Sequence, residues 1–307
     1  MPQPVMDIRA LHILMNDGSG SPGSHPGRDE VITAFAAHGV RARVTVAPGA
    51  RLAEAARAAV RAGADVVVAA GGDGTVNAVA SALTGSPARL AVLPFGTRNH
   101  FARDLGMPLD PATAVAAIVS GSERRIDVGE VNGHLFLNNS SIGLYPALVL
   151  ERDQERRAFR RGKFQAMAIA VARSARRLPV QRVRLAIAGR SLLRMTPFVF
   201  VANNAYSWKP ATFARRQCLE DGRLWCYFPT RHGWLGLARV LLATVFGGLK
   251  GAGDLVGLPV AGFTLHSRRR LLAVALDGEV RHLRPPLRFS SHPGALRVVA
   301  PAGAACA

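Results

Sequence analysis

Strand-like runs and longer amphipathic segments alternate along the first 120 residues of the chain. The strand-like runs are four or five residues long, and they occur at Leu11–Met15, Arg43–Val46, Val66–Ala70 and Leu90–Leu93. Segments with apolar residues at helical spacing lie between these runs, at Arg28–His38 and Leu52–Ala62, and after the last of them, at Pro111–Val119. Fully apolar runs such as Val66–Ala70 are typical of strands buried on both faces. The alternation predicts an α/β domain with a parallel sheet and helices on both faces.

The pattern changes after residue 125, where strand-like segments follow one another with few helices between them. Ile126–Val131 and His134–Asn138 flank Asn132-Gly133, which is a hairpin signal. Four later segments are also strand-like: Val183–Ile187, Leu192–Ala202, Arg223–Phe228 and Leu271–Leu276. We therefore expect a first domain over residues 1–131 and a second, mainly antiparallel β domain over residues 132–292.

Composition narrows the classes of partner. Lysine and arginine outnumber aspartate and glutamate by 39 to 20, and the formal charge of +19 attracts polyanions: nucleic acid, an anionic membrane surface or a nucleotide. An arginine-rich composition without a partner is the alternative. Only 6% of residues are aromatic, and the chain has no RNA-binding aromatic motif or zinc finger, so we expect no specific nucleic-acid partner.

Three cysteines, at no metal-ligand spacing, indicate neither a disulfide framework nor a zinc site, and they favour a reducing cytoplasm. The first residues lack a signal-peptide pattern. The apolar stretch Trp234–Leu249 is too short to span a membrane and contains Arg239, so we expect a buried or interfacial helix. Glu151–Leu178 is helical in pattern and dense in arginine, which fits either an anionic membrane surface or a solvated helix face.

The run Val66–Ala70 leads directly into the sequence GGDGT and then into a segment with helical pattern. Gly71, Gly72 and Gly74 allow backbone amides to approach a ligand closely. Asp73 places a carboxylate among them, and a helix N-terminus favours phosphate oxygens. The stretch predicts a nucleotide phosphate site with an aspartate directed at magnesium. An ordinary turn is the alternative, since the sequence matches neither a Walker A loop nor a GxGxxG fingerprint.

A second transition from strand to loop follows Leu90–Leu93 and carries Gly96, Thr97 and Asn99. The carboxyl ends of neighbouring parallel strands meet at one edge of a sheet. We therefore expect this loop to lie beside GGDGT and to form a cleft with it. A polar loop over Asn16–Gly27 is either a further ligand loop or a plain connector.

Four motifs in order, GGDGTVNAV, LPFGTRNHFARDLGMP, IDVGEVNG and LDGE, resemble the catalytic domain of the diacylglycerol kinase and bacterial lipid kinase family. The resemblance covers nearly the whole chain. It implies an α/β nucleotide domain related to that of NAD kinases, a β-sandwich domain with ATP bound in the cleft between the two, and a return of residues 293–307 to the first domain. Members of the family phosphorylate a lipid hydroxyl with ATP and Mg²⁺.

The resemblance also implies roles for individual residues. The ATP-binding set comprises Thr45, placed after the second strand, with Gly71, Gly72, Asp73, Gly74, Thr75, Val76, Asn77, Gly96, Thr97 and Asn99. The catalytic set comprises Glu279 as proton acceptor, Asp277 beside it, and Asp73 as a magnesium ligand. A second magnesium site would use Asp221 and the carbonyls of Cys218 and Arg223. Plain turns are the alternative at both LDGE and the Asp221 loop.

Two departures from the family pattern fall close to this chemistry. Ala78 stands where a glutamate is usual, and His100 stands where an aspartate is usual, so two carboxylates are missing. We expect a weaker magnesium site. The segment Phe136–Pro146 also resembles a subgroup variant and indicates a different lipid acceptor.

The sequence therefore predicts an ATP-dependent lipid kinase in the cytoplasm, associated peripherally with the inner face of the membrane, where its lipid substrate lies at an anionic surface. A homodimer is one open possibility for its assembly. The alternatives are a catalytically weakened protein that binds nucleotide or anionic lipid, and a soluble small-molecule kinase of the NAD kinase type.

Overall fold

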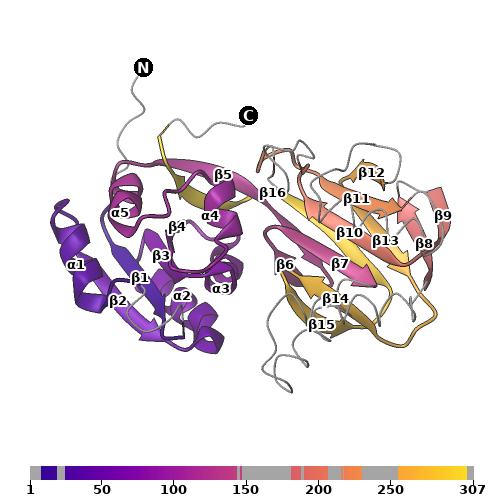
Figure 1. Cartoon of the computed structure of the whole chain (residues 1–307), viewed down its shortest axis with the longest axis horizontal. Coiled ribbons are helices and arrows are strands. Elements are labelled where there is room, and N and C mark those ends of the chain that lie inside the picture. The colour runs from indigo at the N-terminus through magenta and orange to yellow at the C-terminus, as the bar shows by residue number, and fades with distance from the viewer. Residues whose placement is uncertain are drawn as a thin grey trace. The chain divides into compact units, whose positions relative to one another are not determined.

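The structure is a computed structural model that describes residues 8–18, 25–143, 146, 181–187, 190–206, 216, 218–229 and 255–302. The chain divides into two compact units (Figure 1). Unit 1 comprises residues 1–128, 217–221 and 292–307, and unit 2 comprises residues 129–216 and 222–291. Two strands, β5 (Ser122–Val131) and β16 (Leu287–Ala300), run from one unit into the other along the chain.

Unit 1 is built on parallel strands in the order β2-β1-β3-β4, followed by β16. These strands are β1 (Leu11–Asn16), β2 (Ala42–Ala47), β3 (Val66–Gly71) and β4 (Arg89–Pro94). Their helices are α1 (Arg28–Ala36), α2 (Leu52–Arg61), α3 (Asp73–Leu83), α4 (His100–Asp104) and α5 (Pro111–Val119), with a short 3₁₀ helix η1 (Gly49–Arg51). The predicted alternation of strands and helices is confirmed.

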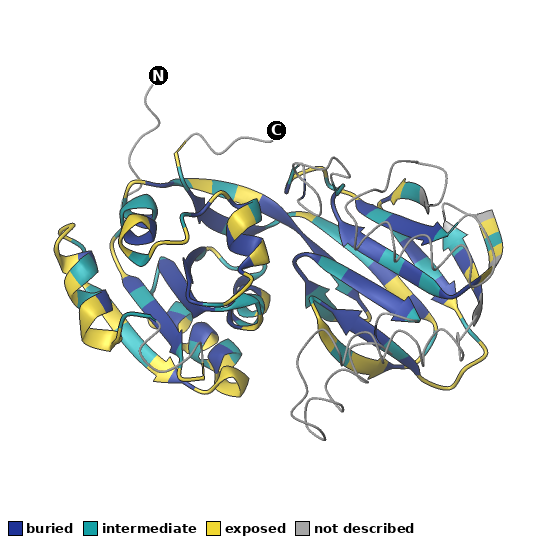
Figure 2. Cartoon of the chain, viewed as in Figure 1, coloured by how far each residue is buried: buried dark blue, intermediate teal, exposed yellow. Residues whose placement is uncertain are grey.

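Burial explains why these segments adopt these elements. All six residues of β3 are buried, as expected for a strand covered on both faces, and Figure 2 shows the strands as the most buried parts of the molecule. Among the helices, α1 packs against α5, and α3 packs against both α2 and α4. The predicted cap of α5 is also confirmed, because the Asp110 carboxylate accepts the Thr113 N–H at 2.9 Å and Pro111 occupies the first helical position.

Unit 2 contains an antiparallel sheet in the order β12-β11-β10-β7-β14-β15. Its strands are β7 (Asn139–Gly143), β10 (Phe198–Asn203), β11 (Leu224–Pro229), β12 (Leu255–Val260), β14 (Leu272–Leu276) and β15 (Glu279–Leu283). Further strands continue the mixed sheet from β16 in the order β13-β8-β9, while β6 pairs with β5; they are β6 (His134–Phe136), β8 (Gln181–Ile187), β9 (Arg190–Thr196) and β13 (Gly262–His266). The molecule therefore has one mixed and one antiparallel sheet.

One hydrophobic core fills unit 2 and takes residues from both sheets. Leu185, Leu265 and Phe289 come from the mixed sheet, and Val201 and Val274 come from the antiparallel sheet. The expected hairpin between β5 and β6 is confirmed, since Val131 pairs with His134 and both turn residues have positive φ angles.

The strand predicted over Leu192–Ala202 is wrong as a single element. The structure divides it at Pro197 into β9 and β10, which belong to different sheets. Proline has no N–H to donate to a strand ladder, so it ends one strand before the next begins. Thr196 stabilises the corner, because its hydroxyl donates to the Phe198 carbonyl at 2.6 Å.

Candidate functional site

The GGDGT turn lies at the carboxyl end of β3, where the chain enters α3. Gly71 ends the strand, Gly72 is the N-cap, and Asp73 opens the helix. A Cβ atom on Gly71 would overlap the buried Thr75 side chain, so this position accommodates only glycine. The Thr75 hydroxyl in turn accepts a hydrogen bond from Asn16 Nδ2 at 3.1 Å, which ties the turn to the end of β1. The turn is therefore fixed from both sides.

The predicted second loop lies directly against this turn. Gly71 pairs with Pro94 across the parallel strands, and a Cβ atom on Gly72 would lie 3.3 Å from the Gly96 Cα. The two loops touch backbone to backbone, with no side chain between them. Asn99 shapes the second loop, because its side chain accepts from the Gly96 N–H at 3.0 Å and donates to the Gly96 carbonyl at 2.7 Å. The expected proximity of the two loops is confirmed.

Asp73 connects the turn to α4. One carboxylate oxygen accepts the Phe101 N–H at 3.3 Å, and the residue is half-buried. Ala78 is half-buried, and His100 is exposed at the start of α4. Within these two loops Asp73 is therefore the carboxylate that could hold a cation. Asn77 adds a buried Oδ1 atom for which the described residues provide no hydrogen-bond donor.

Other members of the predicted ATP-binding set fall into two groups. Gly74 and Thr97 are exposed, whereas Val76 lies in α3 on its buried face and is 3% exposed. Val76 could therefore offer a ligand only its backbone.

The position predicted for Thr45 is wrong, because it lies inside β2 and not after that strand. Its hydroxyl is hydrogen-bonded to His12 Nε2 at 2.8 Å. Burial, and to a lesser extent the nearby Arg43 charge, lower the pKa of His12. The predicted run Arg43–Val46 already contained Thr45, so the residue was wrongly described as following that strand.

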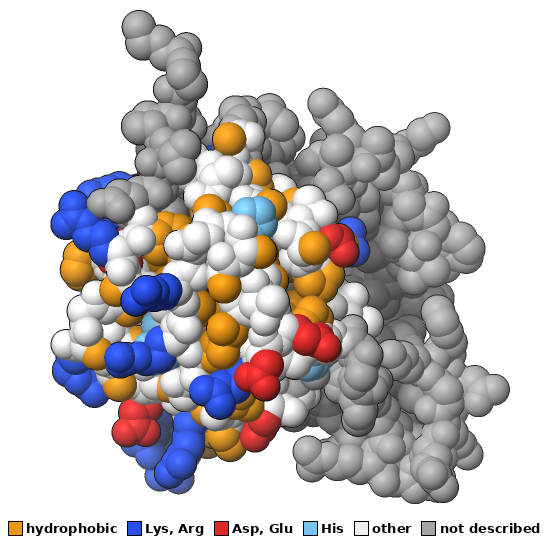
Figure 3. Space-filling model, turned by 90° about the vertical axis from the view of Figure 1, so that its left-hand side faces the viewer, with side chains coloured by type: hydrophobic (Ala, Val, Ile, Leu, Met, Phe, Trp, Pro, Cys, Tyr) orange, Lys and Arg blue, Asp and Glu red, His pale blue; other side chains and the backbone are white. Residues whose placement is uncertain are grey.

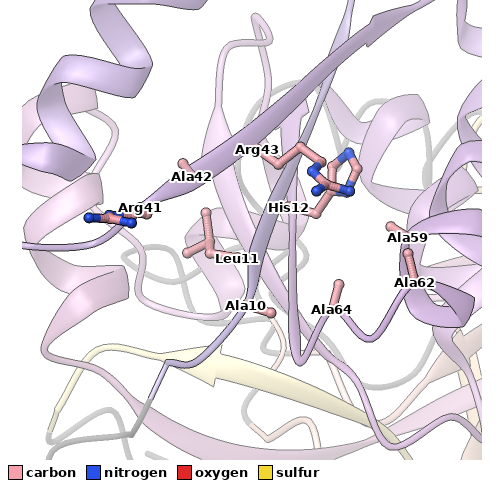
Figure 4. A pocket seen from close by; sticks show the side chains of 9 residues that line it. All are labelled: Ala10, Leu11, His12, Arg41, Ala42, Arg43, Ala59, Ala62 and Ala64. Carbon is pink, nitrogen blue, oxygen red and sulfur yellow. The ribbon is translucent and has the colours of Figure 1, made fainter.

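A cavity of about 310 Å³ lies near these residues, at the opposite ends of the strands from GGDGT (Figure 4). Its lining includes Leu11 and Ala42, the first residues of β1 and β2. Figure 4 shows His12 and Arg43 side by side, while Arg41 points away from them. The cavity is thus separate from the glycine loops.

Asp127 lies in the part of β5 that belongs to unit 1 and is 2% exposed. Its carboxylate accepts the Gly294 N–H at 2.9 Å, and its own N–H donates to the Leu219 carbonyl at 2.9 Å. These bonds hold together three segments of unit 1 that are distant in sequence, which gives Asp127 a structural role.

In unit 2, the LDGE motif forms the hairpin turn between β14 and β15. Leu276 pairs with Glu279, and the two residues between them, Asp277 and Gly278, have φ angles of 47° and 93°. This is the two-residue turn that a DG sequence favours. The backbone of LDGE is therefore a plain hairpin turn. Any chemical role of the motif depends on the side chains of Asp277 and Glu279.

Three backbone N–H groups bind the Asp277 carboxylate. Leu137 donates to Oδ2 at 2.7 Å, while Asn138 and Asn139 donate to Oδ1 at 2.8 and 2.9 Å. The Asp277 N–H returns a bond to the Asn139 carbonyl at 2.9 Å. Desolvation raises the pKa of this carboxyl, although the three hydrogen bonds and Arg216 act in the opposite direction. Asp277 thus fixes the turn to the start of β7.

A buried arginine supports the same segment, and the sequence analysis did not predict it. Arg216 is 7% exposed, and its guanidinium donates to the Leu137 carbonyl at 2.6 Å and to Asn138 Oδ1 at 2.8 Å. Asn203 adds a bond from Nδ2 to the same Leu137 carbonyl at 2.9 Å. Neither residue belongs to a recognised motif, and each lies more than 60 positions from Leu137, so no local signal could have identified them.

Glu279 follows this fixed turn as the first residue of β15, and its side chain is 62% exposed. Its carboxylate lies 3.9 Å from the Arg281 guanidinium, an exposed pair that adds little stability. The backbone of the motif is held rigidly, while the Glu279 carboxylate is open to solvent. That combination suits a group that accepts a proton from an incoming molecule.

At the predicted second magnesium site, the side chain of Asp221 is exposed. The Arg223 carbonyl already accepts the Asn204 N–H at 3.0 Å. Cys218 is disulfide-bonded, which the cysteine pattern did not predict, and only its carbonyl could act as a ligand. Within the described part of the chain, no group of three or more histidine, cysteine, aspartate or glutamate residues could hold a metal ion.

Two predicted segments lie outside the described residues, namely the basic segment Glu151–Leu178 and the apolar segment Trp234–Leu249. Among the residues that are described, no helix is long and apolar enough to cross a membrane.

Comparison with known proteins identifies the chain's relatives. Residues 10–131 match the diacylglycerol kinase catalytic domain. A "Probable lipid kinase YegS-like" protein of Pseudomonas aeruginosa is 33% identical over 301 residues, covering 92% of this chain and 93% of that protein. A Bacillus subtilis diacylglycerol kinase is 47% identical over 77 residues, covering 24% of this chain and 25% of that protein.

Similarity in fold extends over almost the whole length. The crystal structure of a diacylglycerol kinase from Bacillus anthracis str. Sterne covers 98% of this chain and 100% of its own, with a TM-score of 0.69 at 17% sequence identity. At that identity the likeness concerns the fold alone. The sequence matches carry the assignment, and by them this chain belongs to the lipid kinase family defined by the diacylglycerol kinase catalytic domain.

Proposed function

We propose that this protein is an ATP-dependent lipid kinase that transfers the γ-phosphate of ATP to a lipid hydroxyl. The observation that carries the proposal is the direct contact between Gly72 and Gly96 at the start of α3. Because no side chain separates the loops, the GGDGT backbone and the N-terminus of α3 are accessible to phosphate oxygens, while the Gly96 N–H already donates to Asn99 Oδ1. Family membership supports the same reaction.

The residues present fit ATP and a magnesium ion. The glycine contact lets the backbones of the two loops approach each other without an intervening side chain, and Asp73 supplies a hard oxygen ligand. The Asn77 Oδ1 atom needs a hydrogen-bond donor, which a water molecule or a nucleotide hydroxyl would provide. When bound, magnesium would neutralise charge on the phosphates. In this proposal Asp73 does most of the metal binding, since Ala78 and His100 offer no carboxylate.

Unit 2 would supply the general base. Asp277 is fully engaged by three N–H groups, so it positions the turn and does not exchange protons with a substrate. Glu279 would accept the proton of the lipid hydroxyl as the new P–O bond forms. General-base catalysis of this kind contributes about 10²- to 10⁴-fold in rate.

Three further features belong to the proposal. We infer that the α/β unit shares the fold of NAD kinases, that the lipid acceptor lies at an anionic membrane surface on the cytoplasmic side, and that a homodimer is an assembly to be tested. The net charge of +19 supports the membrane surface. A soluble small-molecule kinase of the NAD kinase type would instead not bind anionic vesicles.

A second candidate function is nucleotide or anionic-lipid binding without phosphate transfer. The observation that favours it is the absence of two carboxylates at Ala78 and His100, which leaves Asp73 without acidic neighbours in these loops. Such a protein would bind ATP but would not depend on Glu279.

The test is incubation of the purified protein with labelled ATP, magnesium and a panel of diacylglycerol, phosphatidylglycerol, sphingoid and polyprenol acceptors. We expect one labelled lipid, and we expect Glu279→Gln to reduce its formation by about 10²-fold or more. Glu54→Gln, at an exposed glutamate in α2, is the matched control and should leave the rate unchanged. ATP binding without any labelled lipid would instead favour the second candidate.

A further inference from the structure

The last strand of the mixed sheet, β9, exposes apolar side chains where a strand at a sheet edge usually has polar ones. Leu192 packs against the core of unit 2, so its neighbour Leu193 points to the opposite face. Leu193 and Met195 are each 51% exposed, and both lie on that outer face because they are two residues apart. Strands with one solvated face normally alternate apolar and polar residues. The outer face of β9 departs from this rule at two successive positions.

Basic residues surround these two side chains. His266 on β13 pairs with Arg184 on β8, which pairs with Leu193 on β9, so the three lie side by side in one row. His266 and Arg184 are both exposed. The chain then continues from His266 into three exposed arginines, Arg268–Arg270, followed by Leu271 at 49% exposure. We call this set, Arg184, Leu193, Met195, His266 and Arg268–Leu271, the basic edge surface.

Acidic residues are missing from the segments that form the basic edge surface. Residues 181–196 and 262–271 contain seven arginines and one histidine, and no aspartate or glutamate. By contrast, the α1 and β2 side of unit 1 shows basic and acidic side chains interspersed (Figure 3). These two segments therefore carry seven of the 39 lysine and arginine residues of the chain, without the acidic neighbours that usually accompany surface arginines.

The chemistry of the surface discriminates among partners. Two copies facing each other would bring arginine against arginine, which opposes self-association. Single-stranded nucleic acid is bound by arginine together with stacking on aromatic side chains, and the basic edge surface has no phenylalanine, tyrosine or tryptophan. An anionic bilayer accommodates both groups, since its phosphates pair with arginine while aliphatic side chains enter the boundary between headgroups and acyl chains.

We propose that the basic edge surface docks unit 2 on an anionic lipid bilayer, with Leu193, Met195 and Leu271 entering the interface and the arginines contacting lipid phosphates. The inference rests on the proposed lipid kinase function for its biological purpose, while its physical basis is exposure and charge alone. It gives the enzyme a means of reaching an acceptor that does not leave the membrane.

The test is co-sedimentation of the full chain with vesicles of phosphatidylcholine alone or of phosphatidylcholine with phosphatidylglycerol at a ratio of about 7:3. We expect binding only to the anionic vesicles, and loss of that binding at high salt. The variants Leu193→Gln/Met195→Gln and Arg268→Gln/Arg269→Gln/Arg270→Gln should each weaken vesicle partition by about tenfold or more.

Matched controls come from unit 1. Val46→Gln removes a side chain that is 50% exposed on the edge strand β2, and Arg51→Gln/Arg57→Gln/Arg61→Gln removes three exposed charges. Both should change partition by about twofold or less. Equal effects of the two charge variants would show that net charge alone drives binding and would overturn the proposal. Wild-type protein that ignores anionic vesicles would overturn it too.

Two further measurements distinguish membrane docking from a protein interface and from a defect in catalysis. If sedimentation velocity shows a dimer that the Leu193/Met195 variant converts to monomer, while vesicle binding is unchanged, the surface is a protein interface and the proposal is wrong. Activity with a water-soluble short-chain diacylglycerol separates docking from catalysis. The two variants of the basic edge surface should keep activity on the short-chain substrate and lose activity on diacylglycerol in vesicles. If the protein has no kinase activity but its vesicle binding still depends on the basic edge surface, the proposed function is refuted and the docking proposal is supported.

Discussion

Replacing Gly96 by alanine tests the backbone contact on which the phosphate site depends. A Cβ atom at this position would lie 2.7 Å from Asn99 Oδ1 and closer still to the Gly72 Cα. Carbon atoms in favourable contact are about 3.5–4.0 Å apart, so the two loops must separate by about 1 Å. Backbone atoms cannot rotate away as a flexible side chain can. The perturbation therefore falls on the turn itself.

The expected cost follows from that displacement. Overpacking of this kind lowers the free energy of unfolding by about 1–3 kcal/mol. A shift of about 1 Å in groups that hold a substrate reduces the rate by about 10²-fold. Urea denaturation measures the first quantity, and calorimetric titration with ATP and the initial rate of lipid phosphorylation measure the second.

The matched control is Gly27→Ala, because no atom lies within 4 Å of a Cβ atom at that position and the φ angle of −72° is normal for alanine. This control should leave ATP affinity and rate unchanged and lower the free energy of unfolding by at most about 1 kcal/mol, because alanine is a poorer helix N-cap than glycine. If Gly96→Ala matches it in stability, ATP affinity and rate, the close approach of the two loops does not form and the phosphate-site argument fails.

Three further predictions concern titratable groups. Asp277→Asn should lower the free energy of unfolding by about 1–3 kcal/mol, because its amide would face the Leu137 N–H with a donor. Folding raises the pKa of Asp277 and so favours its protonated form. The wild type should therefore lose stability as pH rises from the ordinary aspartate pKa through the raised one. Denaturation at several pH values should show this loss in the wild type and not in Asp277→Asn. Folding lowers the pKa of His12 and so disfavours its charged form. The free energy of unfolding should therefore fall as pH drops below about 6.5, and His12→Gln should flatten that dependence. An unchanged pH dependence in the variant would show that the imidazole beside Thr45 is open to water. Burial raises the pKa of Cys226 to about 12, so its thiol should react with Ellman's reagent at pH 8 only after unfolding, and rapid reaction of the native thiol would contradict the packing of β11.

The parts of the fold that sequence could predict are those whose cause is local. The buried strand before Gly71 and the helix cap at Asp110 each depend on residues within four positions of one another. The glycine loops were also predictable as neighbours, because parallel strands align their carboxyl ends. Local physics was sufficient in each case.

The remainder depends on pairing between distant segments, which composition does not encode. The strand-like segment Leu192–Ala202 was predicted as one strand because only the missing N–H of Pro197 marks the corner. The Arg216 contact with Leu137 spans 79 positions, and the Asp277 contacts span up to 140. Such bonds become visible only when the strands are placed side by side.

The path of β16 has a consequence for synthesis of the chain. Its C-terminal residues complete the sheet of unit 1 beside β4, where Val298 pairs with Leu90 although more than 200 residues separate them. Leu296, Val298, Val299 and Ala300 are fully buried there. During translation, the flank of β4 therefore stays uncovered until the ribosome has made unit 2. Until then the nascent N-terminal half exposes an unpaired strand edge, which is a site for aggregation.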